Sequence, residues 1–160
     1  MNSNNINYIQ SNPKLVLSVE DLAVAETGTT GHYLTLNSPC CNKRITIHPL
    51  PIQMQNGEII TSSHTALLNH QDLPFQARQE HIFPGPRKAL LSIWTFCEHG
   101  CEATFTNKSV HIKNNQSGRT IMGGTRDART NLYILSLTQQ NNLTMEPKNP
   151  DKYFVGSTYE

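Results

Sequence analysis

Short apolar segments separated by turn residues, rather than long amphipathic repeats, set the fold class of this 160-residue chain. Many of them alternate apolar and polar residues, and they recur about every eight to twelve residues, which is typical of short strands. The Asn56-Gly57 pair lies between two such segments and predicts a tight β-hairpin, because both residues tolerate positive φ. We therefore expect a mainly β domain, a small β-barrel or folded-over sheet of about eight or nine short strands.

One segment departs from this pattern. Residues 88–99 (KALLSIWTFCEH) place apolar residues at helical spacing, and Gly100 follows where a left-handed helix cap belongs. We therefore expect one short buried helix late in the chain. On this interpretation Trp94 lies in the core or in a dimer interface, and Cys97 is a small buried residue of the apolar face.

The two ends of the chain are polar. We predict that residues 1–13 form a lead-in without regular structure, that residues 14–138 form one domain, and that residues 139–160 form a polar tail. The N-terminus lacks the charged start and apolar run of a secretory signal, so we expect an intracellular, cytoplasmic location with reduced thiols. A formal net charge of +1 argues against nucleic acid as a partner, and no apolar run is long enough to predict a membrane span.

An acidic residue follows an apolar strand at Glu26-Thr27-Gly28-Thr29. Aspartic proteases need a carboxylate at the end of a strand, in a tight turn whose glycine lets the backbone approach closely. Two such carboxylates share one proton, so that one activates water while the other protonates the scissile carbonyl. A chain with a single such loop must dimerise to supply both. The same four residues also suit an ordinary strand-to-loop junction with an exposed glutamate, and the short pattern alone favours that interpretation.

The longer run over residues 22–34 (LAVAETGTTGHYL) resembles the protease segment in the Pol polyproteins of copia-type LTR retrotransposons. In that family an apolar strand leads into Asp-Ser/Thr-Gly-Ala-Thr, and a Gly or Ser, a His and an aromatic residue follow. Further segments resemble later parts of the same domain in the same order: residues 51–57 its strand before an Asn/Asp-Gly hairpin, residues 81–85 and 90–93 its VPG…NLLSV segment, and residues 101–106 and 118–137 its closing strands. The similarity covers about residues 14–138.

The resemblance implies a retropepsin-like β-barrel that acts as an aspartic endopeptidase on its own polyprotein, as a homodimer in the cytoplasm or in retroelement particles. It implies that Glu26, Thr27 and Gly28 form the catalytic loop, and that Thr29 and the Asn56-Gly57 hairpin tip, a flap, contact the peptide. The family has Asp where this chain has Glu26, and an extra methylene displaces the carboxyl group by roughly an ångström. We therefore expect weak or absent peptidase activity; the alternative is a catalytically dead barrel that serves as an interaction or dimerisation module.

The four cysteines and seven histidines are the remaining candidates for chemistry. The run from Cys97 to Cys101 carries zinc-type ligands, and Cys40 with Cys41 would complete a set of four, but adjacent cysteines rarely bind one ion. We favour ordinary core or surface thiols and expect no metal and no cofactor. His32 follows the candidate loop; it either lines the cleft or, as we favour, makes a structural hydrogen bond. We interpret the mildly basic C-terminal third, with Lys and Arg residues between 108 and 129, as a solvated face.

Overall fold

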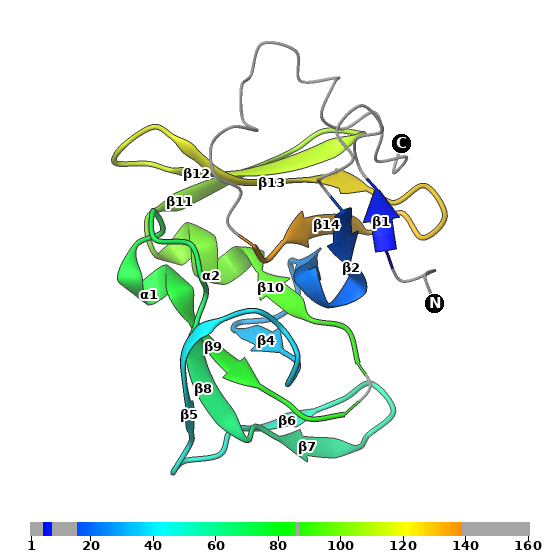
Figure 1. The fold of residues 1–160 in the computed structure, drawn as a ribbon, viewed down its shortest axis with the longest axis vertical. Coiled ribbons are helices and arrows are strands. Elements are labelled where there is room, and N and C mark those ends of the chain that lie inside the picture. Colours follow the sequence, from blue (N-terminus) through cyan, green and yellow to red (C-terminus); the bar gives the residue numbers. More distant parts are fainter. Residues whose placement is uncertain (1–4, 8–15, 86, 139–160) are drawn as a thin grey trace.

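The computed structural model describes residues 5–7, 16–85 and 87–138, and most of its regular structure is short strands (Figure 1). The first elements are β1 (Asn5–Asn7), β2 (Val16–Ser18), the 3-10 helix η2 (Val19–Asp21), β3 (Leu22–Glu26), β4 (His32–Leu34), β5 (Cys41–Ile45), β6 (Pro51–Gln53), β7 (Ile59–Thr61) and β8 (His64–Leu67). They are followed by α1 (Phe75–Arg78), β9 (Gln79–Ile82), β10 (Leu90–Ser92), α2 (Ile93–Glu98), β11 (Cys101–Phe105), β12 (Ser109–Asn114), β13 (Thr120–Arg126) and β14 (Tyr133–Ser136).

Ten of the strands form one sheet in the order β11-β12-β13-β14-β3-β10-β4-β9-β8-β5. Neighbours are antiparallel except for β3 with β10 and β4 with β9, which pair in parallel. Two small sheets, β1-β2 and the β6-β7 hairpin, complete the fold. The mainly β prediction is confirmed. In the described part of the chain the large sheet has two ends, β11 and β5, so its hydrogen bonding does not close into a ring.

The core gathers apolar side chains from the middle of the large sheet and from α2. Phe96 of α2 is fully buried, as are Leu34, Ile82 and Leu91 from three neighbouring strands. Burying each such side chain stabilises the fold by about 1.5–3 kcal/mol relative to leaving it exposed. Ala25 of β3 packs against this cluster. The core therefore fixes one side of β3 and leaves the other side to form a surface.

The helix predicted over residues 88–99 is shorter than expected. Residues 90–92 form β10, an inner strand between β3 and β4, and only Ile93–Glu98 is helical. An inner strand is apolar on both faces, so its sequence carries no period of two and resembles part of a buried helix. Cys97 is exposed, so its predicted burial is wrong. Trp94 is 48% exposed, so it does not lie in the core, and its place in a dimer interface stays a prediction. Gly100 does adopt the expected left-handed conformation, with a φ of 93°.

Three other expectations need correction. Residues Asn5–Asn7 of the predicted lead-in form a strand that pairs with β2; the rest of the lead-in up to residue 13 and the tail over 139–160 lie outside the described residues. The described residues form fourteen strands, where about eight or nine were expected. β5, for example, was not expected, because its Asn, Lys and Arg residues are typical of turns. The short helix α1 was also not predicted.

Gly124 on β13 provides a test of how closely the sheet packs. A Cβ at this position would collide with the backbone carbonyl of Ile134 on β14. We expect Gly124→Ala to lower the free energy of unfolding by about 3 kcal/mol or more, because backbone atoms cannot give way as a flexible side chain can. Gly57→Ala is the matched control. It meets open space but requires a φ of +91°, so it should cost only about 1 kcal/mol. Equal losses in urea unfolding would contradict the packing at Gly124.

Candidate functional site

The candidate loop begins where β3 ends. In the parallel pairing of β3 with β10, Glu26 lies opposite Ser92. The Glu26 carboxyl turns back on its own loop, where Oε2 accepts a hydrogen bond of 3.0 Å from the Gly28 N–H. A Cβ on Gly28 would lie 3.1 Å from that oxygen, so the absence of a side chain makes room for the carboxyl. The Glu26 side chain remains partly exposed and open to solvent.

The start of α2 holds the backbone of this loop in place. The Ser92 hydroxyl caps the helix by accepting from the Thr95 N–H at 3.0 Å, and it donates to the Thr29 carbonyl at 2.7 Å. The Thr95 hydroxyl donates to the Thr30 carbonyl at 3.2 Å. Two hydroxyl groups therefore bind two successive loop carbonyls. Because each bond satisfies a polar group at or near the core, the loop is rigidly positioned.

His32 helps to hold Ser92, and thereby the start of α2, in place. Its Nδ1 accepts from the Ser92 backbone N–H at 2.9 Å, and its Nε2 donates to the Ala77 carbonyl at 2.8 Å. The side chain is fully buried, and its ring centroid lies 4.7 Å from that of Phe96. Burial lowers the pKa of His32 to about 4, so the ring is neutral with its proton on Nε2. The contacts agree with the structural role favoured from the sequence and exclude His32 from the surface of a cleft.

A groove of about 570 Å³ lies along the side of β3 that faces away from the core. Leu22 and Val24 line it, and since alternate residues of a strand point to the same side, Glu26 is on that side too. Its other apolar lining residues come from η2, β3, β14 and the segments before β10 and β14: Val19, Ala23, Ala89, Ala128, Leu132 and Ile134. The lining of the groove therefore follows β3 as far as Val24 and includes no residue of the candidate loop.

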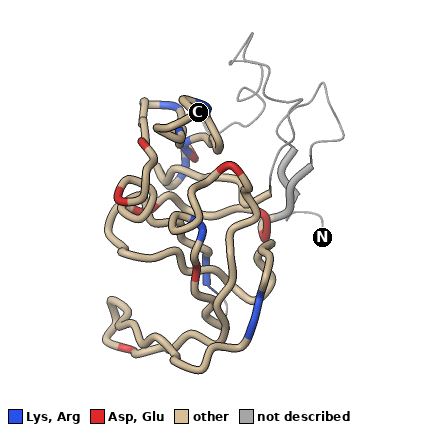
Figure 2. The backbone as a smooth tube through the Cα atoms, turned by 90° about the vertical axis from the view of Figure 1, so that its left-hand side faces the viewer, with Lys and Arg blue, Asp and Glu red and all other residues tan. Residues whose placement is uncertain are grey.

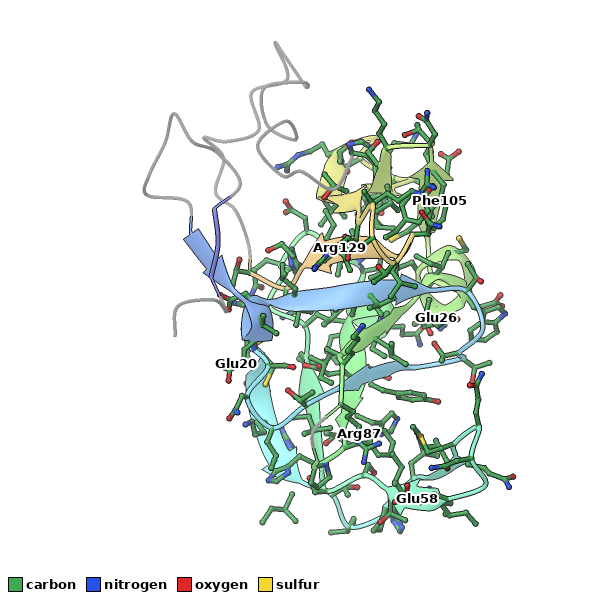
Figure 3. All side chains as sticks on the ribbon, turned by 90° about the vertical axis from the view of Figure 1, so that its right-hand side faces the viewer. Glu20, Glu26, Glu58, Arg87, Phe105 and Arg129 are labelled. Atoms are coloured by element: carbon green, nitrogen blue, oxygen red, sulfur yellow. The ribbon has the colours of Figure 1, made fainter. Side chains whose placement is uncertain are left out.

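Charged residues surround the groove. In Figure 3, β3 crosses the view as a blue arrow from Glu20 to Glu26, with Arg129 above it and Arg87 below it. Lys88 lies beside Arg87 in the lining. Among the described residues, positive and negative side chains are dispersed along the backbone and do not gather into one large region of a single sign (Figure 2). The cationic rim of the groove is therefore a local feature.

The predicted hairpin is present. Gly57 has a φ of 91°, its N–H donates to the Met54 carbonyl at 2.9 Å, and the Asn56 side chain accepts from the Glu58 N–H at 2.9 Å. An added Cβ on Gly57 would have nothing within 4 Å, so it would point into open space. The sequence thus predicts the hairpin correctly, whereas its closure over the loop stays a prediction.

A second cavity, of about 300 Å³, lies under the hairpin. Its walls are Tyr33, Leu34, Ile52, Met54, Ile60, Phe83 and Leu90, and it shares Arg87 and Lys88 with the groove along β3. Arg87 joins the two, since its Nε donates to the Pro84 carbonyl at 3.2 Å and its Nη1 lies 4.0 Å from the Met54 sulfur. Arg87 therefore forms part of the wall of both cavities.

The structure brings Glu26, Thr27, Gly28 and Thr29 together only because they are consecutive. Thr27 is exposed, and the Thr29 hydroxyl is buried without a hydrogen-bond partner among the described residues. Sequence analysis missed the residues that brace the loop, Ser92 and Thr95. A serine directly before an apolar run is a helix-cap signal, but the longer helix predicted over residues 88–99 concealed it.

The cysteines do not form a metal site in the described part of the chain. Cys40 and Cys41 lie at the start of β5, whereas Cys97 and Cys101 lie at the end of α2 and the start of β11. No group of three or more His, Cys, Asp or Glu side chains suited to a metal ion occurs among the described residues. Burial raises the pKa of the Cys101 thiol to about 11, so this thiol is protonated and unreactive at neutral pH.

Comparison with known proteins finds no family model, no curated protein and no solved structure that matches this chain. The family resemblance therefore rests on the sequence motifs, and the function they imply is a proposal. Within the described residues, every helix is too short or too polar to cross a membrane.

A second buried ionisable group, Glu80 on β9, lies in register with His32 of β4. Glu80 is 1% exposed, and neither carboxyl oxygen has a hydrogen-bond partner among the described residues. Burial raises its pKa to about 8, against a smaller opposing effect of Lys43. The carboxyl is therefore protonated at neutral pH. His70 is also buried, and burial lowers its pKa to about 4.

These shifts predict a stability maximum near pH 6.5. Between pH 4 and 6.5, His32 and His70 bind protons only in the unfolded chain, so stability rises with pH. From pH 4.5 to 8, Glu80 holds a proton only in the folded chain, which lowers stability as pH rises. The two histidines outweigh it below pH 6.5, and above that value Glu80 alone gives a decline of up to about 1.4 kcal/mol per pH unit. Urea unfolding at a series of pH values measures both arms.

Glu80→Gln isolates the carboxyl group. The amide cannot ionise, so the variant should lose the decline between pH 6.5 and 8 and keep the rise below it. A wild-type profile without that decline, or a variant that retains it, would assign the pH dependence to other groups.

The bracing of the loop gives a third prediction. Ser92→Ala removes the helix cap and the bond to the Thr29 carbonyl, so it should lower the free energy of unfolding by about 2 kcal/mol. In this variant, hydrogen exchange in residues 27–31 should become faster than in the unaltered chain, while exchange in the strands changes less. Ser117→Ala is the control, because this exposed hydroxyl accepts only from the Arg119 N–H and should cost less than about 0.5 kcal/mol. Unchanged exchange in the loop would contradict its dependence on Ser92.

Proposed function

We propose that this chain is a retropepsin-like protease domain of a copia-type Pol polyprotein, which acts on polypeptides as a homodimer and whose activity is weak because of Glu26. The observation that carries the proposal is a partly exposed carboxyl at the end of β3, in a turn whose backbone is braced by buried groups. The groove along β3 and the hairpin beside it supply space for a peptide. The proposal places the domain inside the cell, in the cytoplasm or in retroelement particles.

The chemistry requires one Glu26 from each of two copies. The ionised carboxylate takes a proton from water as the water oxygen attacks the scissile carbonyl, while the protonated carboxyl gives its proton to the carbonyl oxygen. The resulting diol collapses when a proton reaches the amide nitrogen, the C–N bond breaks, and a carboxylic acid and an amine leave. The Gly28 N–H occupies Oε2, which leaves Oε1 for the water or for the second carboxyl.

Glutamate makes this arrangement less effective than aspartate. Its additional methylene places the carboxyl farther from the braced backbone and adds one rotatable bond to be fixed. In a symmetric dimer the displacement occurs twice, on both sides of the shared proton. A misplacement of about an ångström costs on the order of 100-fold in rate.

The alternative is a catalytically dead domain that serves as an interaction or dimerisation module. The observation that favours it is that the Glu26 side chain makes only a local bond among those given for this loop, to the Gly28 N–H of its own turn. Ser92, Thr95 and His32 bind backbone groups, so the fold does not depend on which acid stands at position 26.

Activity assays on Glu26 variants test the proposal. The unaltered chain, Glu26→Asp and Glu26→Ala are compared on a mixed peptide library between pH 4 and 7, with and without a pepstatin-type inhibitor. Glu26→Asp should raise kcat/KM by about 100-fold, since the shorter side chain restores the productive carboxyl position. Glu26→Ala should show no inhibitor-sensitive turnover.

Sedimentation of each variant accompanies the assay, because a monomer cannot assemble the pair of carboxyls. Turnover confined to the dimeric fraction supports the protease. A stable dimer of Glu26→Asp that cleaves nothing would overturn it in favour of the interaction module.

A further inference from the structure

We infer that the groove along β3 binds extended peptides in which acidic side chains flank an apolar residue. That such peptides are the substrates rests on the proposed function; that they bind does not. The inference comes from the chemistry of the groove lining and from the place of β3 in the sheet.

The position of β3 decides how a ligand is recognised. β3 is an inner strand, paired with β14 on one side and β10 on the other. Its backbone groups are therefore engaged, and a peptide cannot bind by adding a strand to it. Recognition must come from side chains. The volume of about 570 Å³ falls in the usual range for ligand sites, which is about 300–1,000 Å³.

The floor of the groove selects an apolar residue. Leu22, Val24 and Ile134 line the middle of the groove and come from the paired strands β3 and β14. Covering them removes apolar surface from water, which stabilises a complex in proportion to the area. A polar residue placed there would lose its hydration without gaining a partner.

The cationic side chains at the rim of the groove favour ligands with carboxylate groups. The rim's three cationic residues are Arg87, Lys88 and Arg129. Lys88 is exposed, and no hydrogen bond or ion pair to the described residues engages it. The Arg129 side chain is 89% exposed and reaches Asp127 only at 3.9 Å. Arg87 and Arg129 lie on opposite sides of β3 (Figure 3).

The two acidic residues of the rim, Glu20 and Asp127, keep their charges and accept hydrogen bonds from neutral groups. Asp127 accepts from the Arg129 backbone N–H at 3.1 Å and from the Thr130 hydroxyl at 2.9 Å, which fixes the loop before β14. Glu20 accepts from the Asn37 side chain at 3.3 Å. The lining therefore holds three cations and two acids, and this net positive charge complements a peptide carboxylate.

Peptide binding by charge-reversal variants tests the inference. The probe is a fluorescein-labelled octapeptide that alternates glutamate and leucine, compared with the same peptide carrying lysine for glutamate. Fluorescence anisotropy is measured on the full chain and on its Glu26→Ala variant, which removes any cleavage. The glutamate peptide should bind more tightly. The double variant of Lys88→Glu and Arg129→Glu should weaken it by roughly tenfold, and added salt should weaken it as well.

Arg44→Glu is the matched control. Arg44 is an exposed cation on β5, outside the groove lining, and its reversal changes the net charge as each groove reversal does. A single groove reversal must weaken binding more than Arg44→Glu. Equal binding of the two peptides, or equal loss in Arg44→Glu, would overturn the inference. So would variants that alter sedimentation but not peptide binding, because the occupant would then be a second copy of the chain.

The two proposals fail separately. Tight binding of the glutamate peptide without cleavage by any variant supports the groove and overturns the protease. Cleavage by Glu26→Asp without preference for acidic peptides supports the protease and overturns the groove.

Discussion

The parallel pairing of β3 with β10 is the interaction on which the candidate site depends. It brings Ser92 opposite Glu26 and starts α2 directly beside the loop that follows β3. Ser92 and His32 stand 60 residues apart in the sequence and are joined by a hydrogen bond, so this contact forms only when the central sheet is assembled. The conformation of the loop therefore depends on the assembled sheet, and its rigidity is a property of the whole fold.

Two buried ionisable side chains in the same sheet show how differently such groups can be accommodated. His32 uses both ring nitrogens, one as donor and one as acceptor, so its burial costs little beyond the loss of its charged form. Glu80, in register with it on the next strand, has no such partners and stays neutral by holding its proton. The hydrogen bonds of His32 help to position the loop. The buried Glu80 carboxyl instead lowers the stability of the fold as pH rises.

The sequence predicts local features well and long-range ones poorly. The hairpin at Asn56-Gly57 and the cap at Gly100 follow from single residues that tolerate positive φ, and both are present. β10 was mistaken for helix because an inner strand has no polar face. The braces of Ser92 and the cations at 88 and 129 come together only through pairings across the sheet, and no pattern within one segment specifies such pairings.

In this site, the groups that fix the loop backbone are different from the carboxyl group that would react. Backbone carbonyls of Thr29 and Thr30 carry the bracing bonds, while the Glu26 carboxyl contacts only the Gly28 N–H of its own turn. The bonds from Ser92 and Thr95 to the loop therefore do not depend on the Glu26 side chain. A protease and a binding module can share this architecture, because peptide binding needs the groove and its cations, whereas cleavage also needs two carboxyls within reach of one proton.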